Sequence, residues 1–316
     1  PSIDRMALKR GLDFPEDSAG RLMDTSFIAL PDFWTVGQAI DYMRDTDDLP
    51  NQFYEILIVD PVFHLQGYVS LDKLLRAKRP TALKDVMSET SYDVSAYDDQ
   101  EDVALKFQRY NLVSSAVLDD DKRLVGVITI DDIVDVIQQE ADEDILALVG
   151  VGKQEEVTGT VINTTRSRLP WLVINLLTAI LASLVIGFFE ATLEQMVALA
   201  ILMPIVASMG GNAATQTMTV AVRAIATKDL DIYNMSRVIL REAFVGLIHG
   251  IIFAVIMGVV ASLWFSNTQL GLVIATAMVV NMIIAGLAGI LIPIVLNRFK
   301  IDPAIASGVF VTTVTD

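Results

Sequence analysis

Hydrophobic positions follow different patterns in the two halves of the chain. The C-terminal half holds long apolar runs, at residues 169–189, 196–222, 243–265 and 270–296, and a shorter one at 303–316. About 20 consecutive apolar residues cross the hydrocarbon core of a bilayer as a helix, and a buried soluble helix rarely needs that length without charge. The pattern therefore predicts four membrane-spanning helices and part of a fifth, and we expect the chain to be trimmed at both ends.

In the N-terminal half, short apolar strands alternate with helical patterns, and the whole arrangement occurs twice. Residues 65–72 (LQGYVSLD) resemble residues 124–131 (LVGVITID), and each stretch follows an apolar strand that ends in an aspartate. Helical patterns at 35–44 and 100–110 precede these strands. Two copies of strand, helix, strand, turn, strand and helix, spaced by about 60 residues, predict two copies of one small α/β unit.

Charge separates the same two halves. Residues 1–160 carry 32 acidic and 15 basic side chains, whereas residues 161–316 carry 7 and 8. A strongly negative surface repels nucleic acid and attracts cations, so we expect no nucleic-acid partner. The densest acidic run, at 131–144, has no basic residue and seven carboxylates: Asp131, Asp132, Asp135, Glu140, Asp142, Glu143 and Asp144.

Basic residues predict on which side of the membrane the soluble half lies. The short connections at 190–195 and 266–269 contain no Lys or Arg. The other flanks are basic, with Arg166, Arg168, Arg223, Lys228, Arg237, Arg241, Arg298 and Lys300. Because short basic loops stay in the cytoplasm, we predict a multi-pass protein of the plasma (inner) membrane with a cytoplasmic soluble region. The absence of cysteine agrees with a reducing compartment.

The repeated unit has a recognisable sequence in its second copy. Residues 126–132 (GVITIDD) resemble the G-h-h-T-x-x-D signature of CBS domains, in which h is a hydrophobic residue. The first copy departs from it, because Ser70 is followed three residues later by Lys73. The resemblance implies a tandem CBS pair. CBS pairs often bind adenine nucleotides with the aspartate on the ribose, so ATP or another adenine nucleotide is the ligand that the resemblance implies.

Further motifs resemble one family in particular. They are residues 14–23 (FPEDSAGRLM), 210–212 (GGN), 226–231 (ATKDLD), 301–304 (IDPA) and 312–316 (TTVTD). Together they closely resemble the MgtE family of magnesium channels, over the whole chain. The resemblance implies that most of the family's N-terminal domain and the end of the last helix are missing. Ala214 departs from the family, which often has glycine there.

These observations predict a multidomain protein. Its fold class is a cytoplasmic α/β tandem CBS pair followed by an α-helical polytopic membrane domain, with five transmembrane helices of which the fifth is incomplete. The boundaries that we expect are 1–18 for the tail of an N-terminal helical domain, 19–80 for CBS repeat 1, 81–131 for CBS repeat 2, 132–165 for an acidic connecting helix and linker, and 166–316 for the pore domain.

Asp316 is the first candidate for ion binding. If the last helix begins at Pro303, Asp316 lies 13 residues into it, about 20 Å along the axis. A carboxylate at that depth costs at least about 2.5–3.5 kcal/mol unless it faces water, a partner or an ion. The alternative is an aspartate that emerges at the outer surface. By resemblance, Asp316 matches the family's pore aspartate, which is paired across a homodimer and holds hydrated Mg²⁺.

The second apolar run supplies further candidates for the pore lining. Asn212 follows Gly210 and Gly211 near the middle of this run, and glycines can open a helix locally or let two helices approach closely. We expect a helix break at this point, with Asn212 and Gly211 lining the pore together with Thr312. Small-residue packing between helices is the alternative.

The acidic run is a candidate sensor. In a helix, Asp132, Asp135, Asp142 and Glu143 fall within an arc of about 100°, and like charges on one face repel one another unless a cation bridges them. An ordinary solvated face is the alternative. By resemblance, regulatory Mg²⁺ binds at Asp132, Asp135, Glu140, Glu143 and Asp144, and at Glu101 of the second repeat. Asn111 stands where the family can have aspartate.

The function that follows is a homodimeric, Mg²⁺-selective channel that imports magnesium through the lipid bilayer and is gated by cytoplasmic Mg²⁺. Mg²⁺ prefers oxygen ligands and loses its water reluctantly, which suits a site with one carboxylate per subunit. The alternatives are a secondary transporter that exchanges a divalent cation for Na⁺ or H⁺, and a membrane-anchored nucleotide sensor without transport. The sequence contains no nucleophile–base constellation, so we expect no enzyme.

Overall fold

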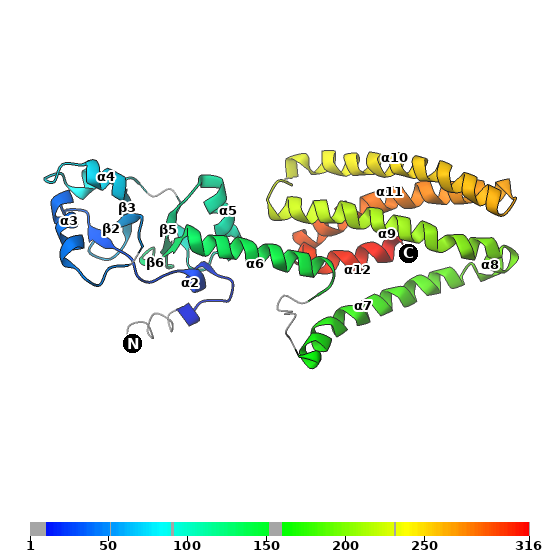
Figure 1. The fold of residues 1–316 in the computed structure, drawn as a ribbon, viewed down its shortest axis with the longest axis horizontal. Helices are drawn as coiled ribbons and strands as arrows, with labels where there is room; N and C mark the ends of the chain where they lie inside the picture. Colours follow the sequence, from blue (N-terminus) through cyan, green and yellow to red (C-terminus); the bar gives the residue numbers. More distant parts are fainter. Residues whose placement is uncertain (1–10, 51, 90–91, 152–159, 231, 316) are drawn as a thin grey trace. The chain divides into compact units, whose positions relative to one another are not determined.

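The chain divides into two compact units, residues 1–141 and 142–316, and each is described by itself (Figure 1). The computed structural model describes residues 11–50, 52–89, 92–151, 160–230 and 232–315.

The first unit contains the repeated α/β arrangement. In its described part, two three-stranded sheets have the orders β1-β2-β3 and β4-β5-β6. In each sheet the first strand pairs parallel with the second, and the second pairs antiparallel with the third. The elements are α2 Ala19–Leu22, β1 Ala29–Pro31, α3 Val36–Asp45, β2 Glu55–Val59, β3 Leu65–Ser70, α4 Leu71–Arg76, the 3₁₀ turn Leu83–Asp85, β4 Val94–Ser95, α5 Gln100–Tyr110, β5 Ser114–Leu118 and β6 Leu124–Thr129.

The two copies match in detail. The antiparallel pairing shifts register between Ile58 and Val59 in one copy, and between Val117 and Leu118 in the other. Each copy also has its own buried core, in which a helix packs on the sheet. A third cluster joins the two sheets, with Leu57 of β2 beside residues of β5 and β6. The predicted repeat is therefore confirmed.

The second unit is helical. Helix α6, Ile130–Leu148, begins in the first unit and ends in the second. The helices that follow are α7 Val161–Gly187, α8 Glu190–Gln195, α9 Val197–Ala226, α10 Ile232–Trp264, α11 Thr268–Arg298 and α12 Pro303–Thr315. Among the described residues, four of these helices, α7, α9, α10 and α11, are long and apolar enough to cross a membrane. Residues 190–195, expected as a loop, instead form the short helix α8.

Helix α11 forms the centre of the packed helices. It contacts α10, α9 and α12, and it carries more buried positions than α9, whereas α7 has none in the described structure. Glycines allow the close approach of α10 and α11: a Cβ at Gly246 would lie 2.6 Å from the carbonyl oxygen of Met282. Small residues at such contacts are typical of membrane helices, because van der Waals packing drives their association.

Candidate functional site

The end of α12 lies against the glycine pair of α9. A Cβ on Gly211 would lie 3.7 Å from Oγ1 of Thr315, and Thr315 is buried. One turn earlier, Val311 packs in one cluster with Ala214 and Met218 of α9. Asp316 lies outside the described residues, but the residue before it is adjacent to Gly211. The structure therefore brings Gly211 of α9 next to Thr315, the last described residue of α12.

One face of α9 is polar and exposed. It consists of Asn212, Thr215, Gln216 and Thr219, which recur at the three- and four-residue spacing of one helix face. The Thr215 hydroxyl donates to the Gly211 carbonyl at 2.9 Å, and the Thr219 hydroxyl donates to the Thr215 carbonyl at 2.9 Å. Their oxygen lone pairs therefore remain available to water or a hydrated ion.

The sequence predicts only Asn212 of this face. The same spacing, searched for as polar residues within an apolar run, would have found Thr215, Gln216 and Thr219. Thr312, the candidate on α12, is half-buried, and its hydroxyl donates to the carbonyls of Gly308 and Val309, each at 3.1 Å.

The expected break in the second apolar run is wrong. Helix α9 runs without interruption from Val197 to Ala226, through Pro204 and the glycine pair. The physical reason is packing: Gly210 faces the Asn281 side chain of α11, at a position where a Cβ would collide with it. The glycine is therefore used for close approach between helices, which was the alternative interpretation.

The acidic run forms part of one helix, as predicted. An oxygen of Asp132 accepts a hydrogen bond from the Thr129 hydroxyl at 2.9 Å, and Glu140 accepts one from the Gln100 side chain at 2.7 Å. Asp135 and Asp142 are exposed, and Glu143 and Asp144 are half-buried. Among the described residues, no three His, Cys, Asp or Glu side chains converge as a metal site.

Glu101 and Asn111 lie at opposite ends of α5. Glu101 is in the first turn, and its backbone N–H donates to the carboxylate of the N-cap residue Asp99 at 2.9 Å. Asn111 is the C-cap and has a left-handed backbone, with φ of 51°. Asn and Asp adopt this conformation more readily than most residues, so the backbone explains either residue type at position 111.

The last turn of α6 packs on the helices that carry the polar candidates. Ala147 is buried in the cluster of α9 and α12 residues. Gly308 of α12 lies so close to Leu148 that a Cβ on it would be 2.9 Å from the Leu148 carbonyl oxygen. Beside this contact is a cavity of about 310 Å³ with Trp171 and Thr312 in its wall. The helix that carries the carboxylates therefore ends directly on α12.

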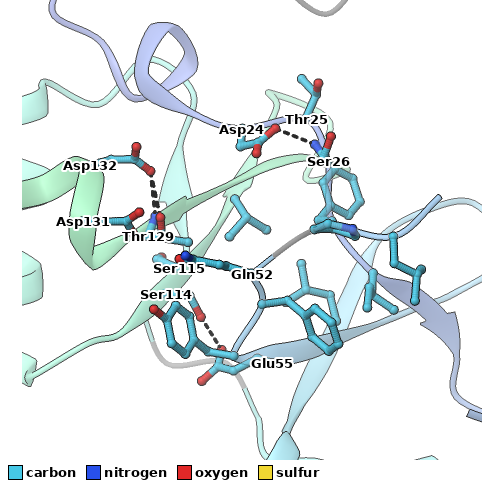
Figure 2. A pocket seen from close by; sticks show the side chains of 18 of the residues that line it. Asp24, Thr25, Ser26, Gln52, Glu55, Ser114, Ser115, Thr129, Asp131 and Asp132 are labelled. Atoms are coloured by element: carbon cyan, nitrogen blue, oxygen red, sulfur yellow. Dashed lines mark hydrogen bonds between the residues drawn. The ribbon is translucent and has the colours of Figure 1, made fainter. Parts of the chain in front are cut away.

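A second site is a cleft of about 830 Å³ in the first unit (Figure 2). Hydroxyl groups line it, from Thr25, Ser26, Ser114, Ser115 and Thr129, and carboxylates line it too, from Asp24, Asp48, Glu55, Asp131 and Asp132. Phe27, Phe53 and Tyr54 add aromatic surface. Among its described lining residues none is Lys or Arg. The cleft can bind a sugar or a base, but it offers no cationic side chain to a phosphate.

The two CBS signatures differ in their hydrogen bonds. In the second copy, Thr129 bonds to Asp132 and both face the large cleft. In the first copy, the Ser70 hydroxyl donates to Asp72 at 2.6 Å, and the Lys73 ammonium donates to the Ser88 hydroxyl at 2.5 Å. The first copy thus has a lysine, already bonded to Ser88, where the second copy has Asp132.

Glu55 lies on β2 and lines both the large cleft and a smaller one of about 250 Å³. Burial raises the pKa of this carboxyl group, because desolvation disfavours the charged form. A hydrogen bond from the Ser114 hydroxyl, at 3.1 Å, opposes the shift. In the smaller cleft, the rings of Tyr92 and Tyr110 stack with centroids 4.1 Å apart.

Known proteins match both units. Residues 203–316 match the MgtE family, described as divalent cation transporters, and residues 83–139 match the CBS domain. The magnesium transporter MgtE of Enterococcus faecalis is 35% identical over 98% of this chain and 68% of its own length. The chain belongs to the MgtE family. The magnesium transporter MgtE of Bacillus subtilis is 32% identical over 96% of this chain and 68% of its own.

This MgtE-family chain is also similar to a solved cytosolic domain. The structure described as the cytosolic domain of the Mg²⁺ channel MgtE in complex with ATP is 31% identical, covers 43% of this chain and 55% of its own, and has a TM-score of 0.41. The family membership confirms the fold class, an α/β CBS pair followed by a helical membrane domain.

Proposed function

We propose that the protein is a Mg²⁺-selective channel gated by cytoplasmic Mg²⁺. One observation carries the link between sensing and conduction: α6 bears the acidic run, and its last turn contacts α12 at Gly308. The relatives named as magnesium transporters support Mg²⁺ as the substrate. Movement of α6 would therefore be transmitted directly to the helix that leads to Asp316.

The pore in this proposal lies between α9 and α12 of two subunits. Asn212, Gly211 and Thr312 would contact the water around the ion, and Asp316 would supply its negative charge. Hydrated Mg²⁺ suits such a lining, because the ion keeps several waters and prefers oxygen. The exposed polar face of α9, within a largely apolar helix, supports this arrangement.

The sensor consists of the α6 carboxylates and Glu101. When Mg²⁺ is plentiful, it would bridge Asp132, Asp135, Glu140, Glu143, Asp144 and Glu101 with acidic groups of a second subunit and hold the closed state. When Mg²⁺ is scarce, mutual repulsion would separate the helices. The ion can shift this equilibrium only if it binds one state better.

An adenine nucleotide is the proposed ligand of the cleft in Figure 2. The hydrogen-bonded pair of Thr129 and Asp132 would receive the ribose, and the aromatic side chains would contact the base. Because the described lining has no cationic side chain, the phosphates would enter with their own Mg²⁺. The nucleotide and the sensor would then share Asp132.

We place the protein in the plasma (inner) membrane with the CBS region in the cytoplasm, on the evidence of the basic flanks. The proposed domain boundaries remain 1–18, 19–80, 81–131, 132–165 and 166–316. Helix α8 would then lie outside the cell. Labelling a cysteine introduced by Thr192→Cys from outside intact cells tests this orientation, and labelling only after permeabilisation would reverse it.

Mg²⁺ flux into liposomes containing the purified protein tests the function. We expect flux to rise linearly with the gradient and to fall as Mg²⁺ on the CBS side increases. Flux that requires a Na⁺ or H⁺ gradient would instead indicate a secondary transporter. No flux, with retained nucleotide binding, would indicate a membrane-anchored sensor.

A further inference from the structure

We propose that Asn281 of α11 is a positioning residue, which sets the rotation of α9 and hence the residues that α9 presents to the pore. The inference rests on the proposed pore between α9 and α12. Its basis is a hydrogen bond between two helices: the Asn281 side-chain amide donates to the Val206 backbone carbonyl at 2.7 Å.

The surroundings of this bond are apolar. Val206 packs in one cluster with Met278 and Met282, the neighbours of Asn281 on α11, and with Ala254 of α10. In a membrane interior, a polar side chain is stable only when it finds a protein partner, and a backbone carbonyl is such a partner. The bond therefore holds α9 to α11 at one defined point.

Gly210 provides the space that the Asn281 amide fills. A Cβ on Gly210 would lie 2.3 Å from the Nδ2 atom of Asn281 and 2.8 Å from its Cγ and Oδ1 atoms. The amide thus occupies the space that the missing side chain leaves, one turn after the carbonyl that it binds. Neither residue can change without affecting the other, so the contact fixes both the depth and the rotation of α9.

The polar face of α9 lies opposite this contact. At 100° per residue, Asn212, Thr215, Gln216 and Thr219 fall between about 140° and 240° from Gly210 around the helix axis. Gly211 falls at about 100°, where it meets Thr315. A rotation by one residue position would move Gly211 away from Thr315 and turn the polar face toward a neighbouring helix. The hydrogen bond opposes that rotation.

Disulfide formation between α9 and α12 measures this geometry directly. The chain has no cysteine, so Gly211→Cys with Thr315→Cys introduces the only thiol pair. The Gly211 Cβ position lies 3.7 Å from Thr315 Oγ1, the atom that the Thr315→Cys sulfur replaces, so the two introduced side chains face each other across the helix contact. In this background, Asn281→Leu removes the hydrogen bond at similar side-chain size. We expect the oxidation rate to fall about threefold to tenfold, the range of membrane hydrogen-bond strengths.

Asn297→Leu is the matched control, because Asn297 is an exposed asparagine on the same helix. It should leave the oxidation rate unchanged. An unchanged rate in Asn281→Leu as well would overturn the proposal.

Gly210 variants distinguish the effect of the hydrogen bond from the effect of packing between α9 and α11. They also provide an alternative test if Asn281→Leu does not fold. Gly210→Ala should slow oxidation by collision with the amide. Gly210→Ala combined with Asn281→Ala removes the collision but also the bond, so oxidation should stay slow. Recovery of the parent rate in this double variant would show that packing alone orients α9 and would overturn the proposal.

Mg²⁺ flux provides the functional test in the chain without introduced cysteines. Asn281→Leu should lower maximal flux about threefold to tenfold, while the Mg²⁺ concentration that half-inhibits flux stays the same, because the sensor is intact. Unchanged flux would overturn the role in the pore. If the parent protein conducts no Mg²⁺, the proposed function fails, but the oxidation rates still decide the role of Asn281.

Discussion

Two polar helix faces in this protein are built from different chemistry. The face of α6 carries carboxylates, such as Asp135 and Asp142, and has no basic residue. The face of α9 carries only amides and hydroxyls, at Asn212, Thr215, Gln216 and Thr219. Charge on α6 makes its spacing from other acidic groups depend on cations, whereas the neutral face of α9 can contact water without holding an ion tightly. In the proposed mechanism, this difference separates Mg²⁺ sensing from conduction.

In the proposed pore, Asp316 supplies the negative charge that the neutral face of α9 lacks. Removal of this charge should therefore have the largest effect on Mg²⁺ flux. Asp316→Ala removes the charge that offsets the lost solvation of a divalent ion, and Mg²⁺ flux in liposomes should fall about 100-fold. Asp316→Asn keeps the size and an acceptor oxygen, and it should fail nearly as badly.

Glu194→Gln is the control for these variants, because Glu194 is an exposed acid in α8. It should conduct like the parent. Each variant must also elute from size exclusion at the same volume as the parent protein. If the Asn variant conducts like the parent, charge at this position does not select the ion; if the Ala variant does, the ion site lies elsewhere, with Asn212 the next candidate.

Neutralising the acidic face should make the α6 surface resemble the α9 surface and remove its response to Mg²⁺. We expect the combined change of Asp132, Asp135, Glu140, Glu143 and Asp144 to Asn or Gln to abolish inhibition by cytoplasmic Mg²⁺, because the bridging cation loses its ligands. Flux at high internal Mg²⁺ should then rise about tenfold.

Five exposed acids of the first unit that lie outside α6 match this charge change: Glu16, Asp45, Asp47, Asp120 and Asp121. Their neutralisation should leave Mg²⁺ inhibition intact. Equal behaviour of the two five-fold variants would mean that the α6 run is an ordinary solvated face.

Gly308→Ala tests the contact between the end of α6 and helix α12. The added Cβ would lie 2.9 Å from the Leu148 carbonyl oxygen, so the end of α6 must move. Because the proposed closed state relies on this contact, we expect flux at high Mg²⁺ to rise about twofold to fivefold, which corresponds to roughly 0.4–1 kcal/mol. Gly187→Ala is the control, since no atom lies within 4 Å of its added Cβ. No difference between the two variants would remove Gly308 from the coupling.

The smallest expected effect is on the stability of the first unit, and it arises from Glu55, whose ionised form is disfavoured by burial. Burial raises the pKa of Glu55 above its ordinary value of 4.5, so the native state loses stability as pH rises through the raised pKa. Glu55→Gln removes this loss. The variant should be more stable than the parent at pH 7 by less than about 1 kcal/mol, and equally stable below pH 4.5.

Hydrogen exchange of the β2 and β5 amides at several pH values, each compared with the parent at the same pH, measures this difference. Glu89→Gln, at an exposed position, is the control and should behave like the parent. A Glu55→Gln advantage that is independent of pH would exclude ionisation as its cause.

The local patterns of this sequence were enough to predict the elements. Alternation and repetition in residues 19–131 predict paired α/β units, because strand and helix periods are properties of neighbouring residues. Four long apolar runs predict α7, α9, α10 and α11, because the bilayer sets their length. The helix of carboxylates follows from spacing alone, and family motifs indicate Asp316.

Only the tertiary structure decided how these elements use their special residues. From the sequence, Gly210 and Gly211 predicted a helix break, with packing as the alternative. The structure decided for packing through Asn281, whose bond to Val206 spans 75 residues of sequence. The contacts of Gly308 with Leu148 and of Gly211 with Thr315 are likewise set by neighbours on other helices. Such contacts leave no local period, because a close approach depends on the shape of both partners, and each partner is distant in the chain.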